Sequence, residues 1–242
     1  MGYVFDFHDA KAYENWYENH RNRLAAELES RLMLDMLKPA AKELVLDIGC
    51  GVGTSLKPLL DQGLSVTGID PSPYMLDIVF NRLNNQVDLY RGYAEDLPFD
   101  DNSFNHACFF TSLEFVDDPK KALSEAFRVA KDKVFLGVLN RYALKGVQRR
   151  VVGVFTQTIY NRAQFYSIWE LKRMVRELLG DVPISWRTVC TFPQPSGPLV
   201  SSIERSALVQ RCPFGTFAGM VVTLVPRFRT RPIALRYQAK PS

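Results

Sequence analysis

The stretch LVLDIGCGVGT, residues 44–54, decides the fold of this chain. A short apolar run leads directly into three glycines, Gly49, Gly51 and Gly53, and a helical window begins at once. Glycines at such a place permit a tight turn and a close approach of the backbone to a ligand, and the start of a helix offers unpaired N–H groups. The stretch therefore predicts a ligand site at the end of a buried strand.

The spacing of the glycines argues against a dinucleotide. A G-x-G-x-x-G pattern would need Gly or Ala at Thr54, or Gly at Leu56. Asp47, just before the glycines, would repel a pyrophosphate but attract an amino group. Asp70 ends the next apolar run and can accept both hydroxyls of a ribose. The two acids indicate an amine-bearing, cationic nucleoside such as S-adenosylmethionine; the alternative is that they only cap helices or lie in solvent.

Strand-like and helical windows alternate on both sides of this motif. Apolar runs at 65–70, 87–91, 104–110 and 133–139 are separated by helical windows at 54–62, 73–84 and 119–130. Such alternation predicts parallel strands with helices on both faces of the sheet. Ser167 and Glu170 form a capping box for a helix at 167–179, and two later strands, 183–192 and 216–225, suggest an antiparallel pair at the sheet edge. We expect an α/β fold with a Rossmann-like, doubly wound sheet of about seven strands, mostly parallel with an antiparallel last strand.

The length of 242 residues fits one domain. The expected parts are an N-terminal helical cap at 1–40, a cofactor-binding core at 41–140, a lid insert at 141–166, and a C-terminal helix with edge strands and a basic tail at 167–242. Within the cap, residues 9–38 are amphipathic and form one long or two short helices.

The net charge of +4 comes from one end of the chain. Residues 205–242 hold seven basic and no acidic residues, and residues 133–169 also lack acidic residues. These segments could favour an anionic substrate, a nucleic acid or a membrane surface, or they could be solvated faces.

The four cysteines, which lie far apart without metal-ligand spacing, predict neither a zinc site nor a disulfide framework. No stretch approaches the roughly 18 apolar residues of a membrane span, and the first residues lack a signal-peptide pattern. We expect a cytoplasmic protein without a metal or a membrane span.

Four motifs carry a family resemblance. DIGCGVG, GIDPSPYML, AEDLPFDDNSF and LEFVDDPKKALSEAFRVAK stand in the order and spacing of class I S-adenosylmethionine-dependent methyltransferases. The chain most resembles the methyltransferase type 11 group, which is similar to the ubiquinone and menaquinone C-methyltransferases. The resemblance covers roughly residues 6–192 and implies S-adenosylmethionine as cofactor and S-adenosylhomocysteine as product.

The resemblance also implies a cofactor site. Asp47 would meet the amine directly or through water, Asp70 would hold the ribose, and the other residues would surround the methionine part, the adenine and the methyl group. These others are Gly49, Cys50, Gly51 and Gly53 for the methionine part, Pro71, Met75, Ala94 and Glu95 for the adenine, and Phe110, Thr111 and Leu113 near the methyl.

Three departures from the family pattern stand out. Gly92, Tyr93 and Ala94 replace the usual Gly-Asp-Ala, so that Tyr93 or Glu95 would take over the adenine contact, unless Tyr93 packs against its neighbours. LEF at 113–115 replaces Leu-His-His, which removes a histidine at the substrate mouth. AKDK at 130–133 replaces a Lys-Pro-Gly-Gly turn, and we expect it to alter only a loop.

Methyl transfer from a sulfonium is an in-line displacement, so the protein must align the reactants, exclude water and, for weakly acidic nucleophiles, remove a proton. The candidates on the substrate side are aromatic residues of the N-terminal helix, which could contribute cation–π attraction, and residues of the lid. They are Tyr13, Trp16 and Tyr17 in the helix and Tyr142, Arg162 and Tyr166 in the lid. Glu114 and Tyr17 are the catalytic candidates. The alternatives are a hydrophobic helix face for the aromatics and a solvated loop carboxylate for Glu114.

The leading hypothesis is therefore a methyltransferase for a small-molecule acceptor. A cofactor-binding regulatory or partner protein without methyl transfer fits the same glycine loop. A nucleic-acid methyltransferase using the basic tail is disfavoured, because TSLEF at 111–115 stands where an Asn-Pro-Pro-Tyr type motif would be expected. The sequence leaves the acceptor and the oligomeric state open.

Overall fold

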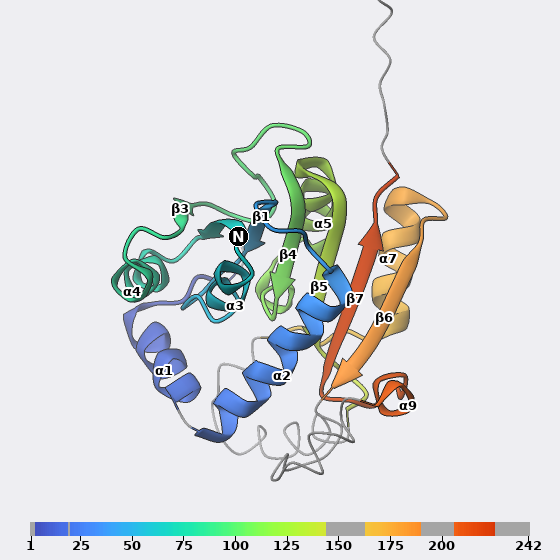
Figure 1. Ribbon diagram of the computed structural model, residues 1–242, viewed down its shortest axis with the longest axis horizontal. Coiled ribbons are helices and arrows are strands. Elements are labelled where there is room, and N and C mark those ends of the chain that lie inside the picture. Colours follow the sequence, from blue (N-terminus) through green and yellow to red (C-terminus); the bar gives the residue numbers. More distant parts are fainter. Residues whose placement is uncertain (1–2, 19, 144–162, 190–205, 226–242) are drawn as a thin grey trace, which may run out of the picture.

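A computed structural model describes residues 3–18, 20–143, 163–189 and 206–225 (Figure 1). The N-terminal cap forms two helices, α1 (Phe7–Glu18) and α2 (His20–Leu37). The remaining elements follow in chain order: β1 (Leu44–Ile48), α3 (Leu56–Asp61), β2 (Ser65–Asp70), α4 (Pro73–Leu83), β3 (Asp88–Arg91), β4 (Phe104–Phe110), η1 (Leu113–Phe115), α5 (Pro119–Val129), β5 (Ala130–Leu139), α7 (Ile168–Leu179), β6 (Ile184–Val189), α9 (Ala207–Gln210) and β7 (Phe217–Thr223).

The seven strands form one sheet in the order β3-β2-β1-β4-β5-β7-β6. Every neighbouring pair is parallel except β5–β7 and β6–β7, so β7 is the one strand of this sheet that runs against the others. The doubly wound sheet with an antiparallel last strand is thereby confirmed. The strand order reverses between β1 and β4, and ligands of open α/β sheets bind at such a switch point, beyond the carboxyl ends of the strands.

Two layers of helices cover the sheet (Figure 1). Alternate residues of β1 point to opposite faces: Val45 packs in the core with α2, α3 and α4, while Leu46 and Ile48 pack in the core with α5 and α7. The strands are therefore nearly all apolar, as expected for a parallel sheet that is buried on both sides.

Local signals fix where the main helices begin. Ser72 caps α4 by accepting a hydrogen bond from the Met75 amide, and Asp118 caps α5 in the same way. Proline at the first helical turn of both helices fits positions that lack an intrahelical N–H partner. The capping box of Ser167 and Glu170 is present at the start of α7.

Residues 130–133 differ from the sequence-based expectation. They do not form a loop, because β5 begins at Ala130, directly after α5 ends at Val129. AKDK contains no glycine or proline to interrupt the chain, and Ala130 is buried in the core. A register shift between β4 and β5 accommodates one additional residue on the β5 side, and the Lys133 ammonium donates to the Leu37 carbonyl at the end of α2.

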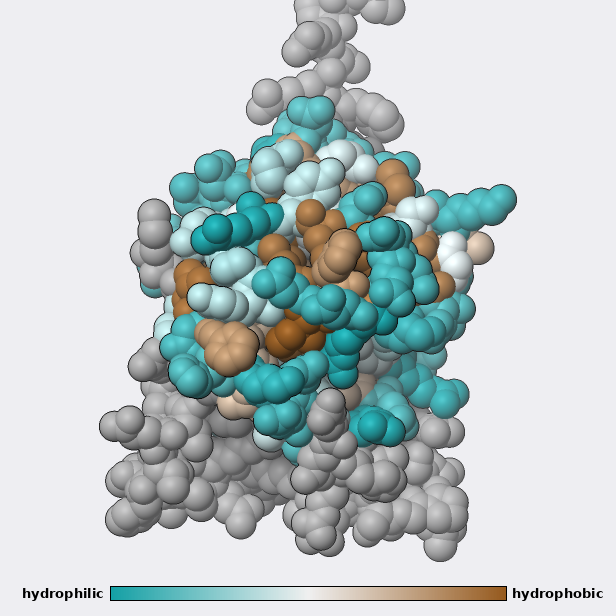
Figure 2. Space-filling view, turned by 90° about the vertical axis from the view of Figure 1, so that its left-hand side faces the viewer, coloured by the Kyte–Doolittle hydropathy of each residue, from teal (hydrophilic) through white to brown (hydrophobic). Residues whose placement is uncertain are grey.

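The face of the molecule that carries α1, α4 and β3 has apolar atoms near its centre, surrounded by hydrophilic ones (Figure 2). Tyr74 and Phe80 of α4 are among the large exposed aromatic side chains of this region. The Phe7 ring of α1 packs edge-on against Tyr74, with ring centroids 5.9 Å apart.

Candidate functional site

A pocket lies at the carboxyl ends of β1, β2, β3 and β4. Its free space, including the part open to solvent, is about 810 Å³. Its walls come from the N-terminal segment and α1, the glycine loop, the start of α4, and the segments after β3 and β4. The lining residues include Tyr3, Phe5, Tyr13, Tyr17, Gly49, Cys50, Gly51, Val52, Thr54, Ser55, Asp70, Pro71, Met75, Gly92, Tyr93, Ala94, Glu95, Phe110, Thr111, Ser112, Phe115 and Val116.

The three glycines of the loop serve different purposes. Gly49 has φ +72°, and a Cβ there would lie 2.5 Å from the Ser112 Cβ. Gly51 has φ +51° and faces open space, since a Cβ would meet no atom within 4 Å. Gly53 does not line this pocket; a Cβ on it would lie 3.2 Å from Val79 of α4. Sequence reasoning placed Gly53 at the ligand, but its role here is close packing against a helix.

Asp70 joins the glycine loop to the end of β2. One carboxylate oxygen accepts the Gly51 amide at 2.9 Å, and the other accepts the Ser72 amide at 2.9 Å. Burial raises the pKa of this carboxyl to about 6, although the two amide hydrogen bonds act in the opposite direction. Asp70 therefore presents a nearly buried acceptor group in the pocket wall.

Asp47 does not line the pocket. It is fully buried behind the loop, where the Ser55 hydroxyl donates to its Oδ2, while Oδ1 has no hydrogen-bond partner among the described residues. Burial, with the nearby charge of Asp70 as a smaller cause, raises the pKa of Asp47 to about 7. A direct contact with a ligand amine is thus not what this geometry offers, and a contact through water remains the compatible form.

The segment after β3 forms another wall of the pocket. Tyr93, Ala94 and Glu95 all line it, and Glu95 Oε1 accepts the Asp117 amide at 3.2 Å. This places the Glu95 carboxylate between the pocket and the loop that leads into α5.

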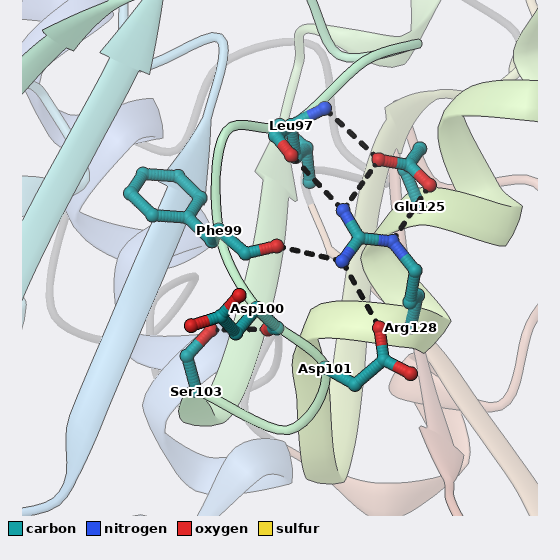
Figure 3. Close-up of polar contacts among 7 residues, drawn as sticks. All are labelled: Leu97, Phe99, Asp100, Asp101, Ser103, Glu125 and Arg128. Carbon is teal, nitrogen blue, oxygen red and sulfur yellow. Dashed lines mark hydrogen bonds and ion pairs between the residues drawn. The ribbon is translucent and has the colours of Figure 1, made fainter.

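Arg128 of α5 fixes the loop that follows this wall (Figure 3). Its guanidinium donates to the Leu97 and Phe99 carbonyls and to the Glu125 and Asp101 carboxylates. Glu125 in turn accepts the Leu97 amide at 2.9 Å. Arg128 was not predicted as a site residue, although it stands in one of the family motifs. The available signal is an arginine one turn after a glutamate on a helix.

Aromatic side chains form the remaining side of the pocket. The Tyr13 and Tyr17 hydroxyls are 3.3 Å apart, and burial raises the pKa of Tyr13. Trp16 packs against both rings without lining the pocket.

The N-terminal segment completes this wall. The Tyr3 amide donates to the Phe115 carbonyl at 3.1 Å, and the Ser72 hydroxyl donates to the Phe5 carbonyl at 2.6 Å. Sequence reasoning missed Tyr3 and Phe5, for which an alternation of aromatic residues was the only signal.

Comparison with known proteins identifies the family. A sequence profile described as a methyltransferase domain matches residues 46–137. A demethylmenaquinone methyltransferase of Renibacterium salmoninarum is 42% identical over 101 residues, which cover 42% of this chain and 42% of that protein. An uncharacterized protein of Methanocaldococcus jannaschii is 31% identical over 180 residues, 72% of this chain and 80% of that one.

A solved structure supports the match over most of the chain. A Thermotoga maritima S-adenosylmethionine-dependent methyltransferase, described as a possible histamine N-methyltransferase, has a TM-score of 0.69 and 25% identity, covering 90% of this chain and 96% of that one. This chain belongs to the S-adenosylmethionine-dependent methyltransferases. The similarity to the curated demethylmenaquinone methyltransferase spans less than half of that protein's length.

The geometry around Gly51 and Asp70 fits the cofactor S-adenosylmethionine, independently of the family assignment. The space above Gly51 is open, the Asp70 carboxylate faces it, and both oxygens of Asp70 retain capacity for further hydrogen bonds. The Asp70 carboxylate matches a ribose with two adjacent hydroxyls. The open space above Gly51 matches the methionine part of the cofactor, which the protein backbone must approach closely.

Several predicted residues of the methyltransferase lie elsewhere. Leu113 is buried in the core beneath the pocket, and Glu114 is 1% exposed rather than solvated. The solvated-carboxylate alternative is wrong, because the Glu114 side chain turns inward and accepts the Leu139 amide at 2.6 Å.

The predicted lid residues of the methyltransferase do not gather at the pocket. Tyr142 is 51% exposed and packs against Trp169, and Tyr166 is buried near the start of α7. Neither lines the pocket, and the chain on either side of the insert is joined by a hydrogen bond from the Arg141 amide to the Tyr166 carbonyl. Arg162, most of the predicted lid and most of the basic tail lie outside the described residues.

The described part of the methyltransferase contains no helix with the length and apolar character needed to cross a bilayer. The same residues contain no cluster of three or more His, Cys, Asp or Glu side chains arranged for a metal ion.

Proposed function

We propose that this protein transfers a methyl group from S-adenosylmethionine to a small, uncharged or aromatic acceptor. The observation that carries the proposal is the composition of the pocket wall formed by the N-terminal segment, α1, the end of β4 and the segment after it. Its described side chains are aromatic, apolar or hydroxyl-bearing: Tyr3, Phe5, Tyr13, Tyr17, Phe110, Thr111, Ser112, Phe115 and Val116. No described Lys, Arg or His lines the pocket to hold an anionic acceptor.

In this proposal different residues bind different parts of the cofactor. Asp70 would hold the ribose, the backbone around Gly49 and Gly51 would hold the methionine part, and Asp47 would reach its amine through water. The remaining candidates, Cys50, Pro71, Met75, Ala94, Glu95, Phe110 and Thr111, would surround the adenine and the methyl group. When bound, S-adenosylmethionine supplies a methyl group on a positively charged sulfur.

The protein itself would align the acceptor with the methyl group and exclude water from the pocket. Phe5 and Phe115 pack edge-on with centroids 5.0 Å apart and would close the pocket over the reacting atoms. The hydroxyls of Tyr13 and Tyr17 can each donate to or accept from a nucleophile. Because burial raises the pKa of Tyr13, this hydroxyl stays protonated at neutral pH and would orient an acceptor rather than deprotonate it.

A pocket without a described histidine or lysine suits acceptors whose nucleophilic atom is already electron-rich. An amine nitrogen and a phenolic or quinol ring are two such acceptors. The names of two similar proteins, a demethylmenaquinone methyltransferase and a possible histamine N-methyltransferase, point to the same two classes. The aromatic wall favours the ring acceptor of the two.

The test has a binding stage and a transfer stage. Calorimetry should detect S-adenosylmethionine binding in the micromolar range, and methyl-labelled cofactor should then label one class in a panel of quinols, phenols, amines and carboxylates. Absence of binding at millimolar cofactor would refute the proposal. Binding without transfer to any acceptor would favour a cofactor-binding regulatory or partner protein. Transfer to carboxylates alone would contradict a pocket whose described lining has no cationic side chain.

A further inference from the structure

A buried carboxylate lies next to the pocket without taking part in its wall. Glu114 is in η1, directly after the residues Thr111 and Ser112 that line the pocket, and Phe115 on its other side lines it as well. The Glu114 side chain is 1% exposed. Its Oε1 accepts the Leu139 amide, and its Oε2 has no hydrogen-bond partner among the described residues.

No described cation neutralises this carboxylate. Arg141, in the segment after β5, donates instead to Glu170 and to the Phe165 carbonyl. Burial, and to a smaller extent the Glu114 charge, raises the pKa of two tyrosine hydroxyls among the described residues, Tyr13 of α1 and Tyr166 before α7. An unpaired charge in a protein interior is costly, and burial accordingly raises the pKa of Glu114 to about 7.

The position of Glu114 in η1 brings its charge to the edge of the pocket. Ser112 and Phe115 on either side of it line the pocket, as does Tyr13, whose pKa the Glu114 charge raises. Since interior charges are screened less than those at the surface, a charge near the wall is felt by a ligand behind it.

The cofactor and its product differ in charge at one atom. The sulfur of S-adenosylmethionine is a cation, whereas the sulfur of S-adenosylhomocysteine is a neutral thioether; their amino, carboxylate, ribose and adenine groups are the same. A fixed negative charge near the sulfur therefore distinguishes the two ligands when the shared contacts cannot.

We propose that Glu114 is a buried counter-charge that makes this pocket bind the cationic cofactor more tightly than its neutral product. The inference rests on the proposed function, because it requires both nucleosides to occupy this pocket. Glu114 acts across the pocket wall without touching the ligand, so it is a specificity-determining residue and not a catalytic one.

The test compares two dissociation constants in three proteins at pH 8. The wild type, Glu114→Gln and the control Glu43→Gln are each titrated with S-adenosylmethionine and with S-adenosylhomocysteine by calorimetry. Glu43 lies at the opposite end of the sheet, paired with His106, so its variant removes one negative charge far from the pocket. Two unit charges about 10 Å apart at an effective dielectric constant of about 20 change a binding constant roughly tenfold, so we expect removal of the Glu114 charge to lower the preference for the cofactor by about that factor.

The expected result is a preference that falls in Glu114→Gln, mainly through weaker cofactor binding, and stays unchanged in Glu43→Gln. An equal preference in all three proteins overturns the inference and leaves the proposed function standing. No binding of either nucleoside to the wild type overturns both.

The wild type alone gives a second readout if the variant does not fold. Its preference should shrink between pH 8 and pH 6, as Glu114 takes up a proton. Asp47 and Asp70 also take up protons in this range. Where the variant folds, its own pH series measures the contribution of those two groups, and a wild-type preference that is constant with pH counts against the inference.

Discussion

The Gly51 amide donates a hydrogen bond to the Asp70 carboxylate across 2.9 Å, which ties the turn after β1 to the end of β2. The two residues lie at the point where neighbouring parallel strands leave the sheet. The carboxylate that the proposal assigns to the ribose therefore also holds the loop assigned to the methionine part. Loss of this side chain should damage both halves of the site at once.

Replacing Asp70 with alanine should weaken S-adenosylmethionine binding at least 100-fold. The change removes the acceptor for the ribose and leaves the Gly51 and Ser72 amides without their partner, each worth about 1–3 kcal/mol when buried. Asp77→Ala, on the exposed face of α4, is the matched control and should bind normally. Calorimetry measures both, and equal affinities for the two variants would contradict the role of Asp70.

Gly49→Ala and Gly51→Ala should separate folding from binding. Alanine at Gly49 must place its Cβ 2.5 Å from Ser112, so we expect a loss of more than about 2 kcal/mol in the free energy of unfolding. Alanine at Gly51 meets no atom within 4 Å and costs only about 1 kcal/mol of backbone strain, yet its methyl group enters the pocket. Urea unfolding and calorimetry on both variants test this. A Gly51→Ala protein with unchanged cofactor affinity would show that the open space is not the ligand site.

Asp47→Asn should change how stability depends on pH. The folded-state pKa of Asp47 is raised to about 7, so its contribution to stability is fully present below about pH 4 and is lost as the pH rises toward 7. The variant lacks this titration. Between pH 5 and pH 8 the wild type should therefore lose about 3 kcal/mol of stability relative to the variant, from about two pH units below the folded-state pKa at roughly 1.4 kcal/mol per unit. Urea unfolding at both pH values measures the difference, and parallel pH profiles would contradict a buried, titrating Asp47.

Arg128→Lys should loosen the loop beside Glu95 although the positive charge is kept. Arg128 donates to two carbonyls and two carboxylates at once, and an ammonium cannot reproduce this planar arrangement. We expect a loss of about 2 kcal/mol in stability and a several-fold weaker cofactor affinity. Arg173→Lys, on an exposed part of α7, is the control. If proteolysis of the loop at residues 96–103 is no faster in Arg128→Lys than in the control, the hydrogen bonds of the Arg128 guanidinium are not what holds the loop.

The sheet was predictable because its signals are local. Apolar runs of strand length, capping residues such as Ser72 and Ser167, and the glycines after β1 each dictate their own neighbourhood. The start of β5 was not predictable in this way. The expectation of a loop at 130–133 came from the family pattern, whereas in this chain β5 follows α5 directly.

The sequence predicted the site residues that lie at the strand ends. It did not predict the residues for which packing decides whether they face the pocket or the core. Gly49, Gly51 and Asp70 follow from the strand ends alone. Whether Asp47, Gly53 and Glu114 face the pocket or the core depends on packing between elements, which spacing along the chain does not reveal. Tyr3 and Phe5 reach the pocket by long-range hydrogen bonds to Phe115 and Ser72, for which no short motif exists.

Those two hydrogen bonds make the N-terminal segment a bridge over the pocket, with one end on the Phe115 carbonyl and the other on the Ser72 hydroxyl. Ser72 is also the residue whose amide donates to the Asp70 carboxylate, so the N-terminal segment and the acid proposed for the ribose share one fixed point at the start of α4. A change in residues 3–5 should therefore reach Asp70 through Ser72, although the two segments are far apart in the sequence.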